Sequence, residues 1–179
     1  MSDRRAGHPI LRNLFRQNQW ANLAMIDACA ATDATILDAD APGTCGTIRE
    51  TLWHIVNSEN HFLVALQGHP DAAGIAILEA PHGDLGALRE HAARIGDGLV
   101  AWASEIADDP MLSGEWGDGP YQVPASMFAA QALLHGREHR VQIGEALQHA
   151  GIPAPDVDAW SWWESFGGSG VGNQLSADS

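Results

Sequence analysis

The sequence predicts an all-α protein, a four-helix bundle followed by a short C-terminal helical segment. Three observations lead to this prediction. Apolar residues recur every three or four positions in four separate segments, which is the period of an amphipathic helix. Proline and glycine separate these segments, and there is little of the strict alternation typical of strands. The length of 179 residues fits one domain with a substantial core.

The first two predicted helices have clear ends. The first extends from about Pro9 to Ala31, and a loop is expected after it. The second extends from about Ile48 to Gln67 and stops at Gly68. Thr47 and Glu50 form the capping-box pattern T-x-x-E at its start, which fixes where the helix begins.

The third and fourth predicted helices enclose a different kind of segment. The third covers about residues 85–106, with Asp84 as its N-cap and apolar residues at alternating spacings of three and four. The fourth extends from about Pro124 to Ala150. Between them, residues 111–123 carry turn-forming residues and are expected to make a short extended excursion.

The C-terminal part contains an aromatic segment and a polar tail. The stretch PDVDAWSWWES is expected to pack as a short helix across the bundle. Residues 167–179, rich in glycine and serine, are expected to be disordered. The predicted organisation is therefore one domain over residues 1–166 and a tail.

The composition excludes several classes of partner. Lys and Arg total 9 against 23 Asp and Glu, a net charge of −14, so the surface would repel a nucleic-acid backbone. No apolar run approaches the roughly 20 residues of a membrane span, and the N-terminal stretch lacks the features of a signal peptide. We therefore expect a cytoplasmic protein, in which Cys29 and Cys45 are reduced thiols.

His135 and His139 are the strongest candidates for a chemical role. A spacing of four places both imidazoles on one face of the fourth helix, where they can reach one metal ion. The alternative is two partly buried histidines that bond to the backbone or to acids. From spacing alone, a third ligand could be His54, His61 or Glu59, all on the second helix.

A competing pattern covers the same histidines. The string from His135 to His139 matches H-x-x-E-H, which in one class of zinc peptidases makes the glutamate, here Glu138, the general base. Too few residues of this sequence follow His139 to form the rest of such a domain. We therefore favour a different origin for the pair.

Four stretches of the chain resemble the DinB/YfiT-like superfamily of metalloenzymes, which is unrelated to the DNA polymerase of similar name. They are QNQWANLAMIDA, GTIRETLWHIVNSE, LLHGREHRVQIGEAL and PAPDVDAWSWWE, in order between about residues 15 and 165. The resemblance implies a bundle that binds a divalent metal, commonly nickel or zinc, through His54, His135 and His139. Many relatives have a second histidine where this chain has Glu138, which alters the surroundings of the last ligand.

The resemblance also implies a range of activities. Characterised members include transferases and isomerases that use low-molecular-weight thiols such as bacillithiol or mycothiol, which makes a metal-dependent S-transferase acting on a small molecule the expected function. Glu59 and Glu138 are the candidate catalytic acids. The alternative is a non-catalytic metal-binding or dimerising protein, and a homodimer through the third helix is expected by resemblance. Trp20, Trp53, Phe62 and Trp116 could line a substrate pocket, although aromatic residues in a bundle more often pack in its core.

Overall fold

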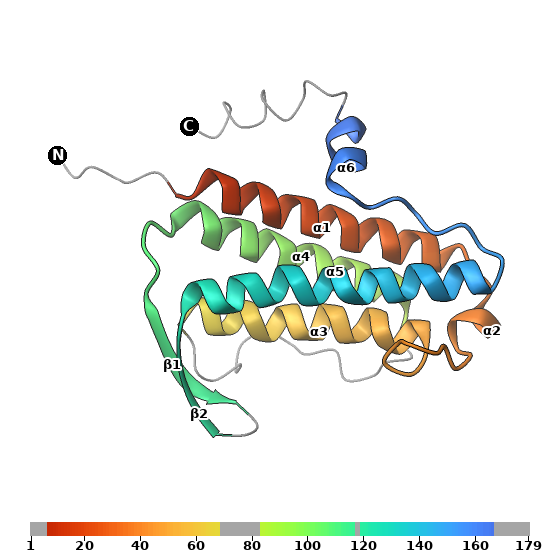
Figure 1. The fold of residues 1–179 in the computed structure, drawn as a ribbon, viewed down its shortest axis with the longest axis horizontal. Helices are drawn as coiled ribbons and strands as arrows, with labels where there is room; N and C mark the ends of the chain where they lie inside the picture. Colours follow the sequence, from red (N-terminus) through yellow and green to blue (C-terminus); the bar gives the residue numbers. More distant parts are fainter. Residues whose placement is uncertain (1–6, 69–82, 117–118, 167–179) are drawn as a thin grey trace.

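The computed structural model describes residues 7–68, 83–116 and 119–166 and is mostly helical, with one small two-stranded sheet. The all-α prediction is therefore broadly confirmed. Four long helices lie side by side (Figure 1), and each begins and ends within one residue of its predicted bounds. They are α1 (Pro9–Ala30), α3 (Ile48–Leu66), α4 (Leu85–Glu105) and α5 (Ala125–His149). The predicted tail lies outside the described residues.

Local capping explains where the helices start. The Thr47 hydroxyl accepts from the backbone N–H of Glu50 at 3.1 Å, and the Glu50 carboxylate accepts from the N–H of Thr47 at 2.8 Å. This reciprocal capping box satisfies two backbone donors that a helix start leaves free. The Asp84 carboxylate caps α4 in the same manner, through the N–H of Gly86 at 2.8 Å.

The long helices share one apolar core. Helix α1 packs against α4 and α5, and α3 packs against α5 and α4. Fully burying each large aliphatic or aromatic side chain stabilises the fold by about 1.5–3 kcal/mol. Within the described part of the chain, no helix is long and apolar enough to cross a membrane. The core includes Phe15, Met25, Ile26, Leu52, Ile55, Leu99, Ile143 and Leu147.

The expected extended excursion is an antiparallel hairpin of β1 (Met111–Trp116) and β2 (Gly119–Pro124). It projects from the end of the molecule at which α5 begins (Figure 1). Tyr121 of β2 packs edge-on against Phe128 of α5, with ring centroids 5.2 Å apart. The hairpin therefore forms a wall beside the first turns of α5.

The segment between α1 and α3 contains a short helix that the sequence did not predict. Helix α2 (Ala34–Leu37) begins at Asp33, whose carboxylate accepts from the N–H and the hydroxyl of Thr35 at 2.8 and 2.7 Å. Residues 38–47 then form a closed loop, because Asp40 and Thr47 pair as an isolated antiparallel bridge.

The predicted C-terminal helix is present, but its predicted packing is only partly correct. Helix α6 (Ala159–Ser165) contacts α1, yet no residue between 159 and 165 is buried. The Trp160 side chain is 72% exposed. Much of the tryptophan surface of α6 therefore stays exposed, and the helix lies against the bundle without entering its core.

The close approach of α1 and α4 depends on Gly96. A Cβ at this position would collide with the side chain of Gln19, whose amide is held by the Ala93 carbonyl at 2.9 Å and by Asp97 at 2.8 Å. We expect Gly96→Ala to lower the free energy of unfolding by about 1–3 kcal/mol, as overpacking does. Gly144→Ala is the matched control.

At Gly144 of α5 a Cβ would meet only Ala154, at an ordinary 3.5 Å, so the substitution should raise stability by about 0.5–1 kcal/mol through helix propensity. Urea denaturation of both variants measures the difference. Equal effects of the two substitutions would contradict the close approach of α1 and α4.

Candidate metal centre

Three imidazoles converge between α3 and α5. The Nε2 atom of His135 lies 3.0 Å from Nε2 of His54 and 3.1 Å from Nε2 of His139. The ring centroids of the three side chains are 4.4–4.9 Å apart. The structure therefore brings together the three histidines that the sequence singled out, although their role as metal ligands stays a prediction.

Hydrogen bonding alone accounts poorly for this arrangement. In neutral imidazole a ring nitrogen carries either one proton or one in-plane lone pair. Nε2 of His135 can therefore form a good hydrogen bond with His54 or with His139, but not with both. Two nitrogens bound to one ion at about 2.0–2.1 Å lie roughly 2.9–3.4 Å apart for bond angles from octahedral to tetrahedral. Both observed separations fall in this range, so the donor set fits a divalent ion.

Gln142 fixes the tautomer of His139. Its amide oxygen accepts a hydrogen bond from Nδ1 of His139 at 2.7 Å, so the ring proton is on Nδ1 and the lone pair of Nε2 faces the other imidazoles. Metal-binding histidines commonly have such a partner on their other nitrogen. Sequence reasoning missed Gln142, whose signal was its place three residues after His139 on the same helical face.

The electrostatic environment favours neutral imidazoles. Burial, together with the nearby His139 and His54, lowers the pKa of His135 to about 4. Burial and His139 also lower the pKa of His54. Since only the neutral ring can donate a lone pair, both rings are in the metal-binding form at neutral pH.

Cys45 is a fourth donor that sequence reasoning did not place near the site. Its Sγ lies 3.9 Å from Nδ1 of His139, and the donor atoms of Cys45, His54 and His139 all lie within 4.8 Å of one another. These three residues form a possible metal-binding group. His135 lies closer still to both histidines, so we take the three imidazoles as the tightest set and Cys45 as the next donor outward.

The other candidates for third ligand lie elsewhere on α3. His61 follows His54 by seven residues, so its backbone lies about 10 Å further along the helix. Glu59 is fully buried, and its carboxylate accepts from the side-chain amides of Asn18 and Asn22 of α1 at 2.8–2.9 Å. The structure therefore places His54, and neither alternative, with the histidine pair of α5.

Glu59 belongs to a buried ion pair that two asparagines bridge. The Asn18 and Asn22 amide groups donate to Glu59, while their carbonyl oxygens accept from Nη1 of Arg140. Burial raises the pKa of Glu59, and the hydrogen bonds and the Arg140 charge oppose that change. A buried carboxylate needs such compensation, and these contacts account for Glu59 without a catalytic role. Its predicted catalytic role has no support in these contacts.

Glu138 of α5 is exposed to solvent. It makes no hydrogen bond or ion pair with any residue that the structure describes. In the H-x-x-E-H interpretation the glutamate should reach the bound ion, so the geometry gives neither the peptidase nor a catalytic role for Glu138 any support.

A cavity of about 480 Å³ opens directly beside His135. This volume lies within the usual range of small-molecule sites. Phe62 belongs to the buried core and also forms one wall of the cavity, where its ring contacts His135 edge-on at 6.0 Å. The lining residues are Ser58, Phe62, Tyr121, Val123, Met127, Phe128, Gln131 and His135, from α3, β2 and α5.

These features define a mostly helical protein with a possible metal-binding group between two of its long helices. The model of the DinB family matches residues 1–167, and the chain belongs to this family. The resemblance seen in the sequence is thereby confirmed. No curated protein was found to match the chain.

Replacing Glu59 tests its structural role. We expect Glu59→Ala to lower the free energy of unfolding by about 3–5 kcal/mol, because the two asparagine amides would lose their buried acceptor and Arg140 its nearby opposite charge. Glu138→Ala, on the exposed surface, should change it by no more than about 0.5 kcal/mol. Urea denaturation provides both values. A stable Glu59→Ala protein that lost only activity would return Glu59 to the catalytic candidates.

Proposed function

We propose that this DinB-family protein is a metal-dependent enzyme of the four-helix-bundle type, in which His54, His135 and His139 hold one divalent ion, zinc or nickel. The observation that carries the proposal is the convergence of three imidazole nitrogens beside a cavity of small-molecule size. A metal site that served stability alone would need no such cavity. The cavity therefore favours catalysis over the non-catalytic alternative.

The donor set suits a catalytic site. His54, His135 and His139 would hold the ion through neutral nitrogens, which would leave its charge uncompensated and a position open to a thiol, water or carbonyl, whose pKa or polarity it would change. His54 and His135 stay neutral because burial lowers their pKa values. Gln142 orients His139, and the cavity binds the substrate next to His135.

The walls of the cavity indicate the kind of substrate. Phe62, Tyr121 and Phe128 offer aromatic surface, while Ser58 and Gln131 offer hydrogen bonds near the imidazoles. A small, partly apolar electrophile fits this lining. The cavity lining and the membership of the DinB family together support one reaction, the transfer of a low-molecular-weight thiol to such an electrophile.

The metal proposal is tested by metal content and calorimetry on protein purified without a histidine tag. We expect one zinc or nickel ion per chain, and a stability gain of about 2.7 kcal/mol at a free metal concentration of 100 times Kd. His135→Ala should abolish this gain. His149→Ala, at the exposed end of α5, should leave it unchanged. Equal binding by both variants would contradict the proposal.

The substrate cavity is tested by filling it. Val123 of β2 lines the cavity, so Val123→Trp should raise KM or abolish turnover in a thiol-transfer screen while the metal content stays the same. Gln122→Trp is the matched control, because its side chain lies on the exposed face of the same strand. If both variants turned over substrate equally well, the reaction would have to take place elsewhere.

A further inference from the structure

The loop before α3 holds Cys45 in a defined position. The backbone N–H of Cys45 donates to the Thr51 hydroxyl at 3.0 Å, and that hydroxyl donates to the Thr47 carbonyl at 2.8 Å. Thr51 is completely buried and lies on α3, three residues before His54. Cys45 is therefore tied to the same helix that carries one of the three imidazoles.

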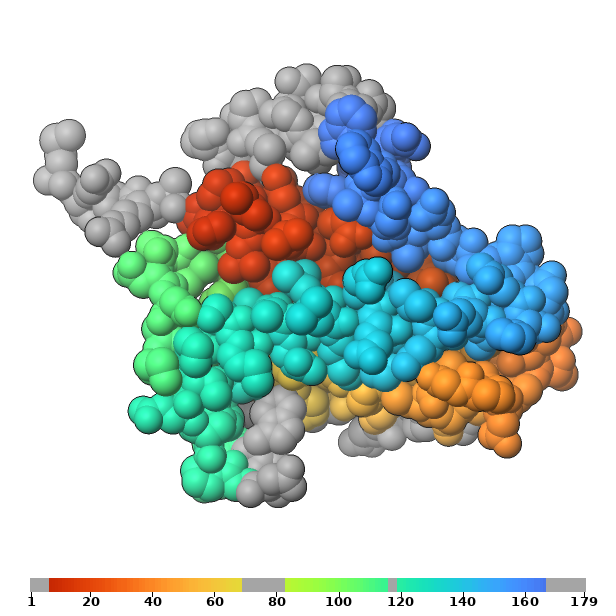
Figure 2. All heavy atoms as spheres, in the orientation of Figure 1, coloured from red at the N-terminus to blue at the C-terminus, as the bar shows by residue number. Residues whose placement is uncertain are grey.

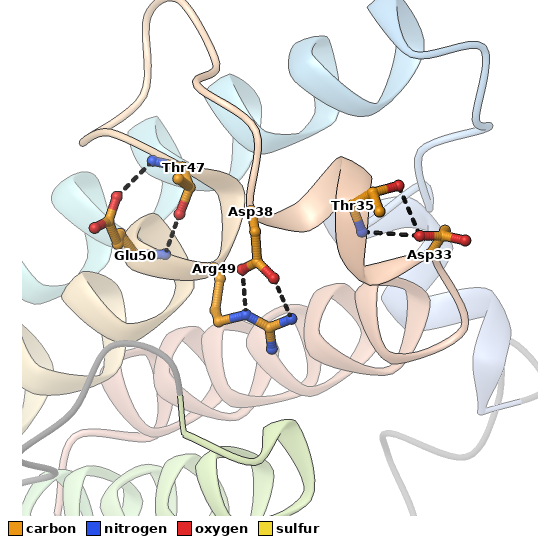
Figure 3. A network of polar contacts seen from close by, with 6 residues as sticks. All are labelled: Asp33, Thr35, Asp38, Thr47, Arg49 and Glu50. Carbon is orange, nitrogen blue, oxygen red and sulfur yellow. Dashed lines mark hydrogen bonds and ion pairs between the residues drawn. The ribbon is translucent and has the colours of Figure 1, made fainter.

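Further contacts close the loop around Cys45 (Figure 3). Arg49 forms an ion pair with Asp38, with Nε 2.6 Å from the carboxylate oxygen, and the capping box joins Thr47 to Glu50. Gly46 has a φ of +97°, which favours glycine, and a Cβ there would collide with the Glu50 carboxylate. These contacts fix the backbone of the loop, so a change in the position of Sγ would come from rotation of the Cys45 side chain.

The loop carries the thiol toward α5. Figure 2 shows the segment between α2 and α3 lying against the side of α5, and the 3.9 Å contact between Sγ and His139 is part of this packing. The cavity beside His135 is lined by α3, β2 and α5, and Cys45 is not among its lining residues as far as the structure describes them. Cys45 thus approaches the imidazoles from another direction.

We propose that Cys45 is the fourth protein ligand of the metal held by His54, His135 and His139, an inference that rests on the proposed function. A sulfur and a nitrogen bound to one zinc ion lie roughly 3.5 Å apart, given bond lengths of about 2.3 and 2.0–2.1 Å. The donor atoms of Cys45, His54 and His139 lie within 4.8 Å of one another. The printed contact of Sγ is with Nδ1 of His139, the nitrogen that bonds Gln142, so ligation requires the exposed Cys45 side chain to rotate toward the Nε2 atoms.

On binding, the Cys45 thiol would lose its proton to solvent and its sulfur would take the fourth position at the ion. Three histidines and one cysteine would make a closed, four-coordinate set, so the open position of the proposed function would be available only while Cys45 is displaced. A small thiol that enters from the cavity then has to displace Cys45 or add as a fifth ligand. Cys45 would thereby strengthen metal binding while no substrate is present, and a substrate thiol would displace it.

Absorption spectroscopy of the full chain loaded with Co²⁺ tests this inference. The wild-type protein should show a near-ultraviolet thiolate-to-cobalt charge-transfer band, and Cys45→Ser should lose it. Cys45→Ser should also weaken Co²⁺ binding at least tenfold, roughly the smallest loss seen for an outer-shell partner. Cys29→Ala is the control, because Cys29 is buried within the core and should leave the band unchanged.

Iodoacetamide labelling gives a second readout. Since the chain has two cysteines and burial raises the pKa of Cys29 to about 12, labelling of the native protein reports on Cys45. Co²⁺ should slow it, and an added small thiol should restore it. Stoichiometric Co²⁺ binding without the band, or without protection, would overturn the role of Cys45 and leave the three-histidine site intact. Failure of the wild-type protein to bind Co²⁺ would overturn both.

Discussion

A buried network of polar side chains links α3 and α5 through α1. Glu59 of α3 and Arg140 of α5 are joined through the amide groups of Asn18 and Asn22, which donate to the acid and accept from the base. Gly136 allows this approach, since a Cβ there would lie 3.0 Å from the Glu59 carboxylate. Arg140 directly follows His139, so the polar network in the core and the imidazole cluster share one alignment of helices.

With the alignment fixed, two further segments complete the site from different directions. The hairpin supplies Tyr121 and Val123 to the cavity at His135, while the loop after α2 carries Cys45 to His139. The hairpin lies at the end of the bundle where α5 begins, and the loop after α2 lies at the other end (Figure 1). In the proposed function the helices would provide the metal donors, and the connections would provide contacts to the substrate and a further thiol.

Periodicity and punctuation in the sequence predict the four long helices to within one residue, because caps such as Thr47 and Asp84 act locally. The spacing of four residues also predicts, from local sequence alone, that His135 and His139 share one face of α5. Gln142 had a local signal on the face of His139 that was overlooked. The positions of Cys45 beside His139 and of Glu59 beside Asn18, Asn22 and Arg140 depend on which segments meet in the fold. That pairing comes from contacts between residues far apart in the sequence, which no local pattern encodes. Family resemblance, not spacing, selected His54 over His61.

The central claim is that one cation contacts imidazoles from both α3 and α5. An anomalous-scattering map from crystals of the zinc- or nickel-loaded protein, recorded at the absorption edge of the metal, tests it most directly. The account predicts a single peak about 2.0–2.2 Å from the Nε2 atoms of His54, His135 and His139. A peak at other histidines, or one that leaves out His54, would contradict it.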